Sequence, residues 1–244
     1  MPHHREKSRL KSLMAVESHG MRAAILNELF EIFSARELFG FLSILESRMS
    51  QQDVHSRKIL HSLFVNWLET APKWQERIAE LPRSLLVAHL RHMSQFEPYD
   101  AWKTFDPKEY VFPDDRMLTL GERRARSRRP DPKSIESFLY DPDRVVATHL
   151  LQNTRITQAH VIRMACKRPT TGEALRSIFE SEKFGLSRQI MLALIQNPYT
   201  PYPVVFGLAF LLSQTELSLL RDVESMSPTL KHMVVHLHEE RQRI

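Results

Sequence analysis

Several residue types that other fold classes depend on are scarce in this chain. Only six glycines occur among 244 residues, few for a β-rich fold, whose hairpin turns need positive φ angles. The single cysteine, Cys166, cannot form a disulfide within the chain, so we expect a reducing, cytoplasmic setting. No run of 18 apolar residues is present, which predicts no membrane insertion. The first residues are charged and lack the continuous apolar run of a signal peptide.

Motifs that would indicate an enzyme or a cofactor site are also missing. The sequence contains no G-x-G-x-x-G or G-x-x-x-x-G-K-[ST] phosphate loop and no H-E-x-x-H zinc motif. His232 and His236 have the spacing of half a zinc site, but no cysteine pair supplies further ligands. Cys166 has no recognisable catalytic partner, and we expect it to be a small buried core residue. The sequence therefore predicts no catalytic residue, no cofactor and no metal.

The overall composition is that of a globular protein. Hydrophobic residues make up 42% and charged residues 26% of the chain, which is typical of a packed domain and not of a disordered one. The 34 basic and 29 acidic side chains leave a net charge of +5. This mild excess permits a nucleic-acid partner without arguing strongly for one.

Helix signals recur along the whole sequence. Ser34 to Glu37, Thr119 to Glu122 and Ser213 to Glu216 have the form of capping boxes, in which the first side chain and the last satisfy each other's backbone N–H groups. Apolar stripes with helical spacing follow, and several prolines stand directly after a capping residue, where a missing N–H costs nothing. No convincing period-2 alternation bounded by hairpin turns is found. The sequence predicts an all-α fold.

Three regions of the chain differ in the periodicity of their apolar residues. Residues 1–95 are predicted to form an N-terminal helical bundle or cap, with helices at 6–33, 35–50, 53–69, 73–80 and 83–94, the first of them open to interruption at Gly20. Residues 96–118 show little periodicity but hold several aromatic residues, so we expect an ordered connecting segment whose rings are packed on the protein. Residues 119–244 are predicted to form short, closely spaced helices.

The C-terminal region contains an internal repeat. Leu150-Leu-Gln-Asn153 matches Leu194-Ile-Gln-Asn197 at an offset of 44 residues, and the apolar positions that follow keep the same offset. A second match joins Arg129-Pro130 to Arg168-Pro169. The period lies in the range of HEAT and armadillo repeats, about 40–47 residues. We expect each asparagine to close a helix in the left-handed conformation.

The segment Asn197-Pro-Tyr-Thr-Pro201 resembles the N-P-x-T-P turns of the bacterial HEAT-like and leucine-rich-variant repeat proteins. The resemblance covers about residues 119–240. It implies an α-solenoid of helical hairpins, a fold that mostly binds other macromolecules. Leucine-rich-variant proteins can also carry a cysteine cluster for an iron–sulfur centre, which the lone cysteine of this chain cannot form.

The densest charge run is a basic ridge formed by Arg123, Arg124, Arg126, Arg128 and Arg129. On one helix these side chains cannot all face a core, so part of the ridge must be solvated. It could bind nucleic-acid phosphates or an acidic protein partner. Alternatively residues 97–115, with a net charge of −4, could neutralise it. Because no aromatic residues are interleaved with the arginines, stacking on single-stranded bases is disfavoured.

A second candidate surface lies at the turn between repeats, where Tyr199 and Tyr202 stand among three prolines. Turns along one edge of a solenoid often bind partners, and tyrosine is enriched at interaction hot spots. The alternative is that these rings pack between adjacent repeats.

The sequence thus favours a non-enzymatic helical-repeat scaffold that binds a protein partner. A basic, HEAT-like nucleic-acid-binding protein using the arginine ridge is the alternative. DNA glycosylases with HEAT-like folds are a remote third possibility, since no motif here supplies their catalytic acid. The oligomeric state is left open.

Overall fold

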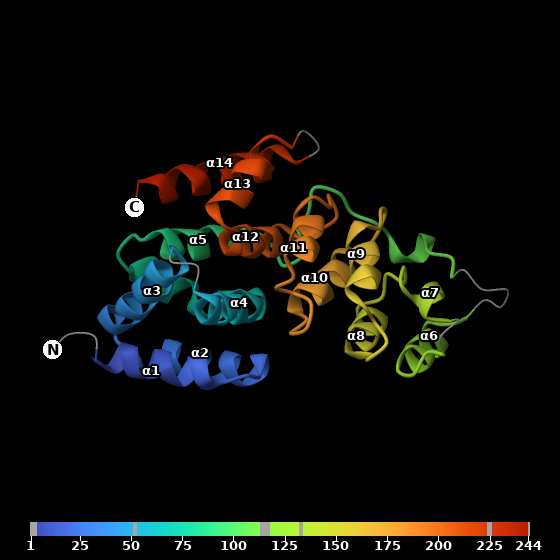
Figure 1. Ribbon diagram of the computed structural model, residues 1–244, viewed down its shortest axis with the longest axis horizontal. Coiled ribbons are helices and arrows are strands. Elements are labelled where there is room, and N and C mark those ends of the chain that lie inside the picture. The colour runs from blue at the N-terminus through green and yellow to red at the C-terminus, as the bar shows by residue number, and fades with distance from the viewer. Residues whose placement is uncertain (1–3, 51–52, 113–117, 132–133, 224–225, 244) are drawn as a thin grey trace. The chain divides into compact units, whose positions relative to one another are not determined.

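The computed structural model describes residues 4–50, 53–112, 118–131, 134–223 and 226–243 (Figure 1). Over these residues the chain forms fourteen α-helices and one short 3-10 helix, with no strand. The predicted all-α class is confirmed. None of the helices in this part of the chain combines the length and apolar character needed to cross a bilayer.

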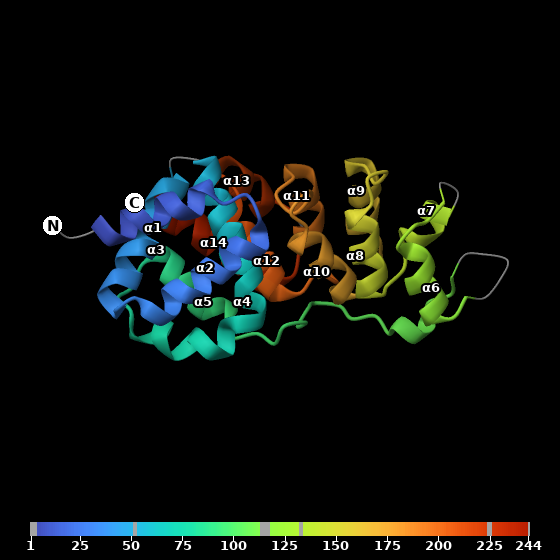
Figure 2. The same cartoon turned by 90° about the horizontal axis from the view of Figure 1, so that it is seen from below.

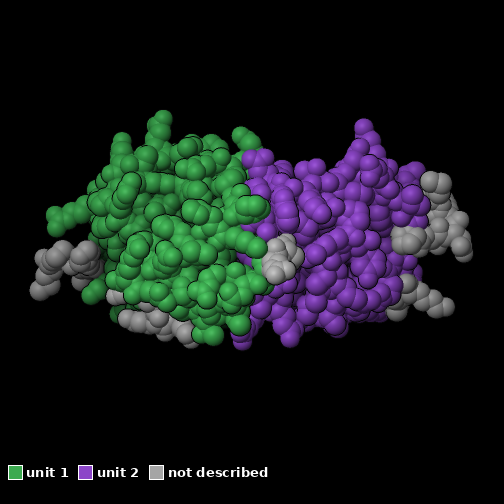
Figure 3. Space-filling model, turned by 90° about the horizontal axis from the view of Figure 1, so that it is seen from above, with its two compact units in different colours: residues 1–98, 206–224, 228–244 green, residues 99–205, 225–227 purple. Residues whose placement is uncertain are grey.

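The contacts divide the chain into two compact units (Figure 3). Unit 1 contains residues 1–98, 206–224 and 228–244, and unit 2 contains residues 99–205 and 225–227. We had expected residues 206–244 to belong with the repeat region that begins at 119. In the structure residues 206–224 and 228–244 group with the N-terminal helices, because the C-terminal helices supply part of the same core.

Unit 1 is a bundle in which helices pack both on the next helix and on the one after it: α2 packs on α4, α3 on α1, α4 and α5, and α13 on α14. Its helices are α1 (His4–Ala15), α2 (His19–Ile32), α3 (Ala35–Ser50), α4 (Val54–Glu80), α5 (Leu85–Met93), most of α12 (Tyr202–Leu211), α13 (Gln214–Arg221) and α14 (Pro228–Gln242).

The N-terminal helix boundaries differ from the prediction in two places. The first helix is interrupted at residues 16–18, just before Gly20, so α1 and α2 are separate. Helix α4 continues through Pro72 as a single helix of 27 residues, where we expected two. Apolar side chains on both sides of the proline, among them Trp67 and Trp74, are buried. Their packing offsets the hydrogen bond that the proline removes.

Arginine side chains close the C-terminal ends of several helices in unit 1. The last carbonyls of a helix have no partner within it, and glycine in the left-handed conformation often completes such ends. No described glycine here has a positive φ. Instead, guanidinium groups from other helices donate to these carbonyls: Arg22 to the carbonyls of Val16 and Glu17 after α1, Arg77 to those of Glu31 and Phe33 at α2, Arg91 to those of Ile78, Ala79 and Leu81 at α4, and Arg241 to those of Phe210 and Leu212 at α12.

A buried histidine joins α5 to α12 within unit 1. His89 Nε2 donates to the carbonyl of Phe206 at 2.8 Å, which assigns the proton to that nitrogen. The imidazole lies 4.8 Å from the ring of Phe210 and 5.9 Å from that of Phe64, centroid to centroid. Burial lowers the pKa of His89 to about 3, so the ring is neutral at physiological pH. Burial also lowers the pKa of Arg241, which lies over Phe210, to about 10.

Unit 2 consists of short helices in two rows (Figure 1). Helix α8 packs on both α6 and α10, and α9 packs on α11. The elements are η1 (Pro107–Glu109), α6 (Leu120–Ser127), α7 (Ser134–Phe138), α8 (Arg144–Gln152), α9 (Gln158–Cys166), α10 (Gly172–Glu180) and α11 (Arg188–Ile195).

The 44-residue offset relates helix starts as well as sequence, but it spans three helices and not the single helical hairpin that the repeat predicts. Helix α8 begins at Arg144 and α11 at Arg188, while α9 begins at Gln158 and α12 at Tyr202. Asn153 does not act as predicted, however. Asn153 has φ −71° and ψ 132°, an extended conformation and not a left-handed one. Its Oδ1 accepts from the N–H of Arg155, two residues on, just as Asn197 Oδ1 accepts from the N–H of Tyr199. The shared role of the asparagines is thus a side-chain turn.

The described part of the connecting segment runs alongside the helices of unit 2 (Figure 2). The Lys103 N–H donates to the carbonyl of Pro198, and the Tyr202 N–H donates to that of Asp100. Farther along, Phe112 is 7% exposed and its ring lies 5.0 Å from that of Phe138. Phe112 thus anchors one part of the segment, whereas Tyr99 and Trp102 remain 38% and 45% exposed.

The buried histidine makes unit 1 sensitive to acid. The unfolded chain takes up a proton at the ordinary histidine pKa of 6.5, whereas folded His89 stays neutral down to about pH 3. Each pH unit below 6.5 should therefore lower the free energy of unfolding by about 1.4 kcal/mol through this residue. In His89→Gln, which keeps a donor for the Phe206 carbonyl, urea unfolding between pH 7 and pH 4 should show a correspondingly weaker dependence on pH. His55→Gln, at an exposed histidine, is the matched control, and an equal slope in wild type and His89→Gln would contradict the assignment.

Candidate functional site

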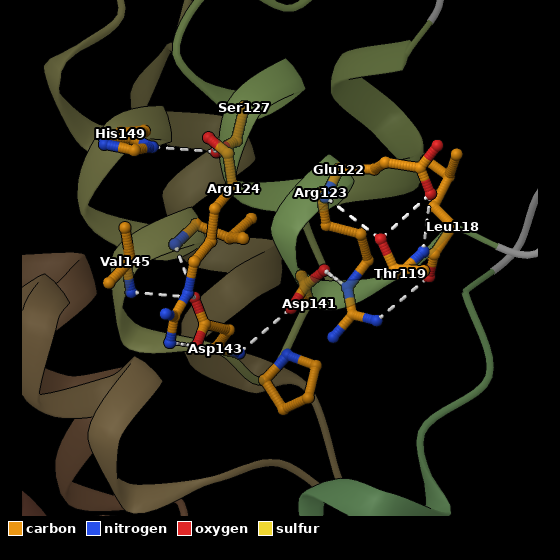
Figure 4. Close-up of polar contacts among 12 residues, drawn as sticks. Leu118, Thr119, Glu122, Arg123, Arg124, Ser127, Asp141, Asp143, Val145 and His149 are labelled. Atoms are coloured by element: carbon orange, nitrogen blue, oxygen red, sulfur yellow. Dashed lines mark hydrogen bonds and ion pairs between the residues drawn. The ribbon is translucent and has the colours of Figure 1, made fainter.

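The basic ridge begins on α6, whose start is set by local sequence. Thr119 Oγ1 accepts from the Glu122 N–H, and Glu122 Oε2 accepts from the Thr119 N–H, which confirms the predicted capping box. From this start, Arg123 and Arg124 point toward the loop that precedes α8 (Figure 4). Arg126, Arg128 and Arg129, toward the other end of α6 and just beyond it, are exposed.

Arg123 forms a largely buried ion pair with Asp141. Its Nε lies 2.7 Å from Asp141 Oδ2, and the two side chains are 15% and 0% exposed. The N–H is not aligned for a hydrogen bond, so the contact is mainly electrostatic. The guanidinium also lies over the ring of Tyr110, 5.5 Å from its centroid. Burial raises the pKa of Asp141 above its usual value, against the opposing effects of the Asp143 N–H and Arg123.

Arg124 forms a more exposed, two-pronged contact with Asp143. Its Nε and Nη2 donate to the two carboxylate oxygens at 3.0 and 2.7 Å, a geometry that suits guanidinium and carboxylate groups. Asp143 also accepts from the N–H groups of Val145 and Val146 and so caps α8. Burial raises the pKa of Asp143, but Arg124 and these N–H groups outweigh that effect, so the net shift is downward.

The counter-charges of the ridge therefore come from the loop before α8. The connecting segment, which we had considered as the source of neutralising charge, contributes the ring of Tyr110 to Arg123. Two of the acidic residues that we considered for this role, Asp114 and Asp115, lie outside the described residues. Within the described part of the chain, no carboxylate pairs with Arg126, Arg128 or Arg129. We call these three side chains the open arginines.

A polar pocket of about 300 Å³ adjoins one of the open arginines. It is lined by Arg128, His149, Gln152 and Asn153. These residues meet because α6 packs on α8 with the C-terminal ends of both helices on the same side (Figure 4). The lining combines one guanidinium, one imidazole and two amides, and it contains no carboxylate.

The orientation of the pocket histidine is set by Ser127. The Ser127 hydroxyl donates to the carbonyl of Arg124 at 3.0 Å and lies 2.9 Å from His149 Nδ1. Since a carbonyl can only accept, the hydroxyl proton is used there, and we assign the Nδ1 proton of His149 to the bond with Ser127. The neutral imidazole then carries an unprotonated Nε2.

This serine–histidine pair is not arranged for nucleophilic catalysis. A serine nucleophile must reach substrate and give its proton to the histidine. Ser127 is 0% exposed and gives its proton to the backbone. Its role is to hold His149 in place.

The second predicted surface, at Tyr199 and Tyr202, lies apart from these residues in sequence and is partly used by the chain itself. Both tyrosines are half-buried. Asn197, at the start of the turn, is buried and donates to the carbonyls of Ala165 and Lys167. The connecting segment hydrogen-bonds to the same turn through the Tyr202 N–H. Much of the turn is therefore occupied by contacts within unit 2, and the two tyrosines are only partly available to a partner.

Cys166 is exposed, and the prediction that it is a buried core residue is wrong. It is the last residue of α9, where Val161, Met164 and Ala165 form the buried stripe. A search of the described residues finds no group of three or more histidine, cysteine or acidic side chains placed to hold a metal ion.

Sequence reasoning identified the arginines but missed the rest of the pocket. His149 and Ser127 are 22 residues apart, and nothing in the local pattern joins them. Asn153 was singled out only as a helix end. The 44-residue repeat was the one feature of the sequence that pointed to the pocket, because it marked Asn153 as a residue at the end of a helix.

Comparison with models of protein families, with curated proteins and with solved structures finds no match for this chain. The site must therefore be interpreted from its own geometry.

The two ion pairs should differ sharply in their contribution to stability. Arg123→Met leaves Asp141 buried without its cation, and we expect a loss of about 3 kcal/mol in the free energy of unfolding. Arg124→Met breaks an exposed pair and should cost less than about 1 kcal/mol. Urea denaturation of both variants measures the difference. Equal losses would show that the Arg123–Asp141 contact is not the stronger constraint on α6.

Proposed function

We propose that this chain is a non-enzymatic helical-repeat scaffold whose unit 2 binds an acidic segment of a protein partner at the open arginines. One observation carries the proposal. Arg123 and Arg124 are matched by aspartates of the same unit, whereas Arg126, Arg128 and Arg129 are exposed and have no carboxylate partner among the described residues. Three adjacent, unmatched cations beside a polar pocket form a surface that an anionic ligand would complement.

The arrangement of helices supports the scaffold part of the proposal. Helix α8 packs between α6 and α10, and α9 packs on α11, so the helices of unit 2 alternate between two rows. Alternating packing of this kind is expected of stacked helical hairpins, as in HEAT-like repeats, which present extended surfaces to other macromolecules.

Charge distribution favours a second candidate, a nucleic-acid partner. Unit 2 contains 17 basic and 13 acidic residues, whereas unit 1 contains 17 and 16. Most of the positive excess of the chain therefore belongs to the unit that carries the open arginines. Against this candidate, no aromatic residue lines the pocket, and base stacking usually accompanies single-strand binding.

A glycosylase would need an acid and aromatic residues converging in a basic cleft. The lining of this pocket contains no acid and no phenylalanine, tyrosine or tryptophan, so this pocket does not favour the third possibility.

Binding of a labelled deca-glutamate peptide, measured by fluorescence anisotropy, tests the proposal directly. We expect binding at about 50 mM salt that weakens markedly by about 200 mM, because most of the attraction is electrostatic. The variant Arg126→Glu/Arg128→Glu/Arg129→Glu should bind at least about tenfold more weakly. Lys7→Glu/Lys11→Glu/Arg83→Glu makes the same change in net charge at exposed positions of unit 1 and is the matched control.

The same titration with duplex DNA and single-stranded RNA separates the two candidates. Tighter binding of either nucleic acid than of the peptide, lost in the open-arginine variant, would favour the second candidate. An equal loss in the unit 1 control would show that net charge alone drives association. No binding of any probe at low salt would reject both.

A further inference from the structure

The pocket beside the open arginines combines a guanidinium group, two side-chain amides and an imidazole nitrogen. The guanidinium of Arg128 can only donate. Asn153 Oδ1 accepts from the Arg155 N–H at 2.9 Å, and this bond assigns the oxygen to the backbone and leaves the NH₂ group as the free end of the amide. Gln152, an exposed lining residue, adds a second amide.

His149 adds a nitrogen of adjustable character. Its Nδ1 is held by Ser127, so the ligand-facing role falls to Nε2. This nitrogen accepts a hydrogen bond from a ligand when the ring is neutral and donates one when the ring is protonated. A group that is anionic but can itself carry a proton is the natural complement of such a nitrogen.

We infer that this pocket binds a phosphate group carried on a side chain of the partner protein, that is, a phosphorylated serine or threonine. The inference rests on the proposed function and specifies the ligand of the same surface. A phosphate monoester offers three terminal oxygens and a charge of about −1.5 to −2 at neutral pH. Its unprotonated oxygens accept from the guanidinium and the amide NH₂ groups, and the P–OH of its monoanion donates to Nε2, whereas a carboxylate has only two oxygens and leaves donors unsatisfied.

The size of the pocket agrees with a small group. The pocket has a volume of about 300 Å³ and is open to solvent, so it can take a small group presented on the surface of a partner. The absence of any carboxylate from its lining removes the repulsion that a dianion would otherwise meet. The neighbouring Arg126 and Arg129 can then contact acidic residues that flank the phosphorylated one, as arginine clusters do in phosphopeptide recognition.

Isothermal titration calorimetry with three probes tests this inference on the full-length chain. The probes are N-acetyl-O-phosphoserine amide, N-acetylglutamate amide and inorganic phosphate. We expect the phosphoserine compound to bind at least about tenfold more tightly than the glutamate compound. We also expect it to bind more tightly than inorganic phosphate, which lacks the peptide groups. The proton NMR signals of the His149 ring should shift on titration.

Three single substitutions locate the binding. Arg128→Gln should weaken phosphoserine binding about tenfold, since it removes a charged donor. His149→Asn keeps a donor for Ser127 near the Nδ1 position but removes Nε2, and it should weaken binding by a similar factor. Arg155→Gln removes an exposed charge two residues beyond Asn153, outside the pocket lining, and should leave binding within about twofold. Unchanged thermal melting would show that each variant is folded.

The outcomes separate the inference from the proposed function. Equal affinity for the phosphoserine and glutamate compounds would overturn the phosphate assignment, and deca-glutamate binding would still support the scaffold. Equal weakening by Arg155→Gln and Arg128→Gln would also overturn it, because binding would then follow diffuse charge. Inorganic phosphate binding as tightly as the phosphoserine compound would overturn the peptide source. Failure of both phosphoserine and deca-glutamate would reject inference and function together.

Discussion

The structure depends on closing helix C-terminal ends in a chain that has almost no glycine to do so. Carbonyls at a helix end that lack partners cost free energy when buried. Here arginine side chains from other segments supply the missing donors: Arg22, Arg77, Arg91 and Arg241 in unit 1, and Arg168, which donates to the carbonyl of Gln196, in unit 2. Each of these bonds joins two segments of one unit. The same contacts that complete the helices therefore also fix how they pack.

This use of arginine changes how the basic character of the chain should be interpreted. An excess of positive charge is usually attributed to ligand binding. Here many of the arginine side chains instead bind backbone carbonyls at helix ends or form ion pairs with carboxylates of the same unit. On α6 the paired arginines and the first unpaired one lie within a single turn of the helix. Arg123 is paired with a fully buried aspartate and Arg124 with the residue that caps α8. These two pairs fix α6 against α8, and only the arginines beyond them are left open to a ligand.

The pocket is a consequence of that fixed packing. Because α6 and α8 lie with their C-terminal ends together, the buried hydroxyl of Ser127 reaches His149 and sets its tautomer. Arg128 and Asn153, each just past the end of its helix, then face the same space.

The sequence by itself determined the features that depend on neighbouring residues. Capping boxes at Ser34, Thr119 and Ser213 were predictable because a helix start is satisfied within four residues. Features that depend on distant residues were not. Pro72 stays inside α4 because core packing outweighs one lost hydrogen bond, and Cys166 is exposed because α9 turns its buried stripe elsewhere. Which arginines are matched was decided only by tertiary structure, since Asp141 and Asp143 reach α6 through folding and not through sequence spacing.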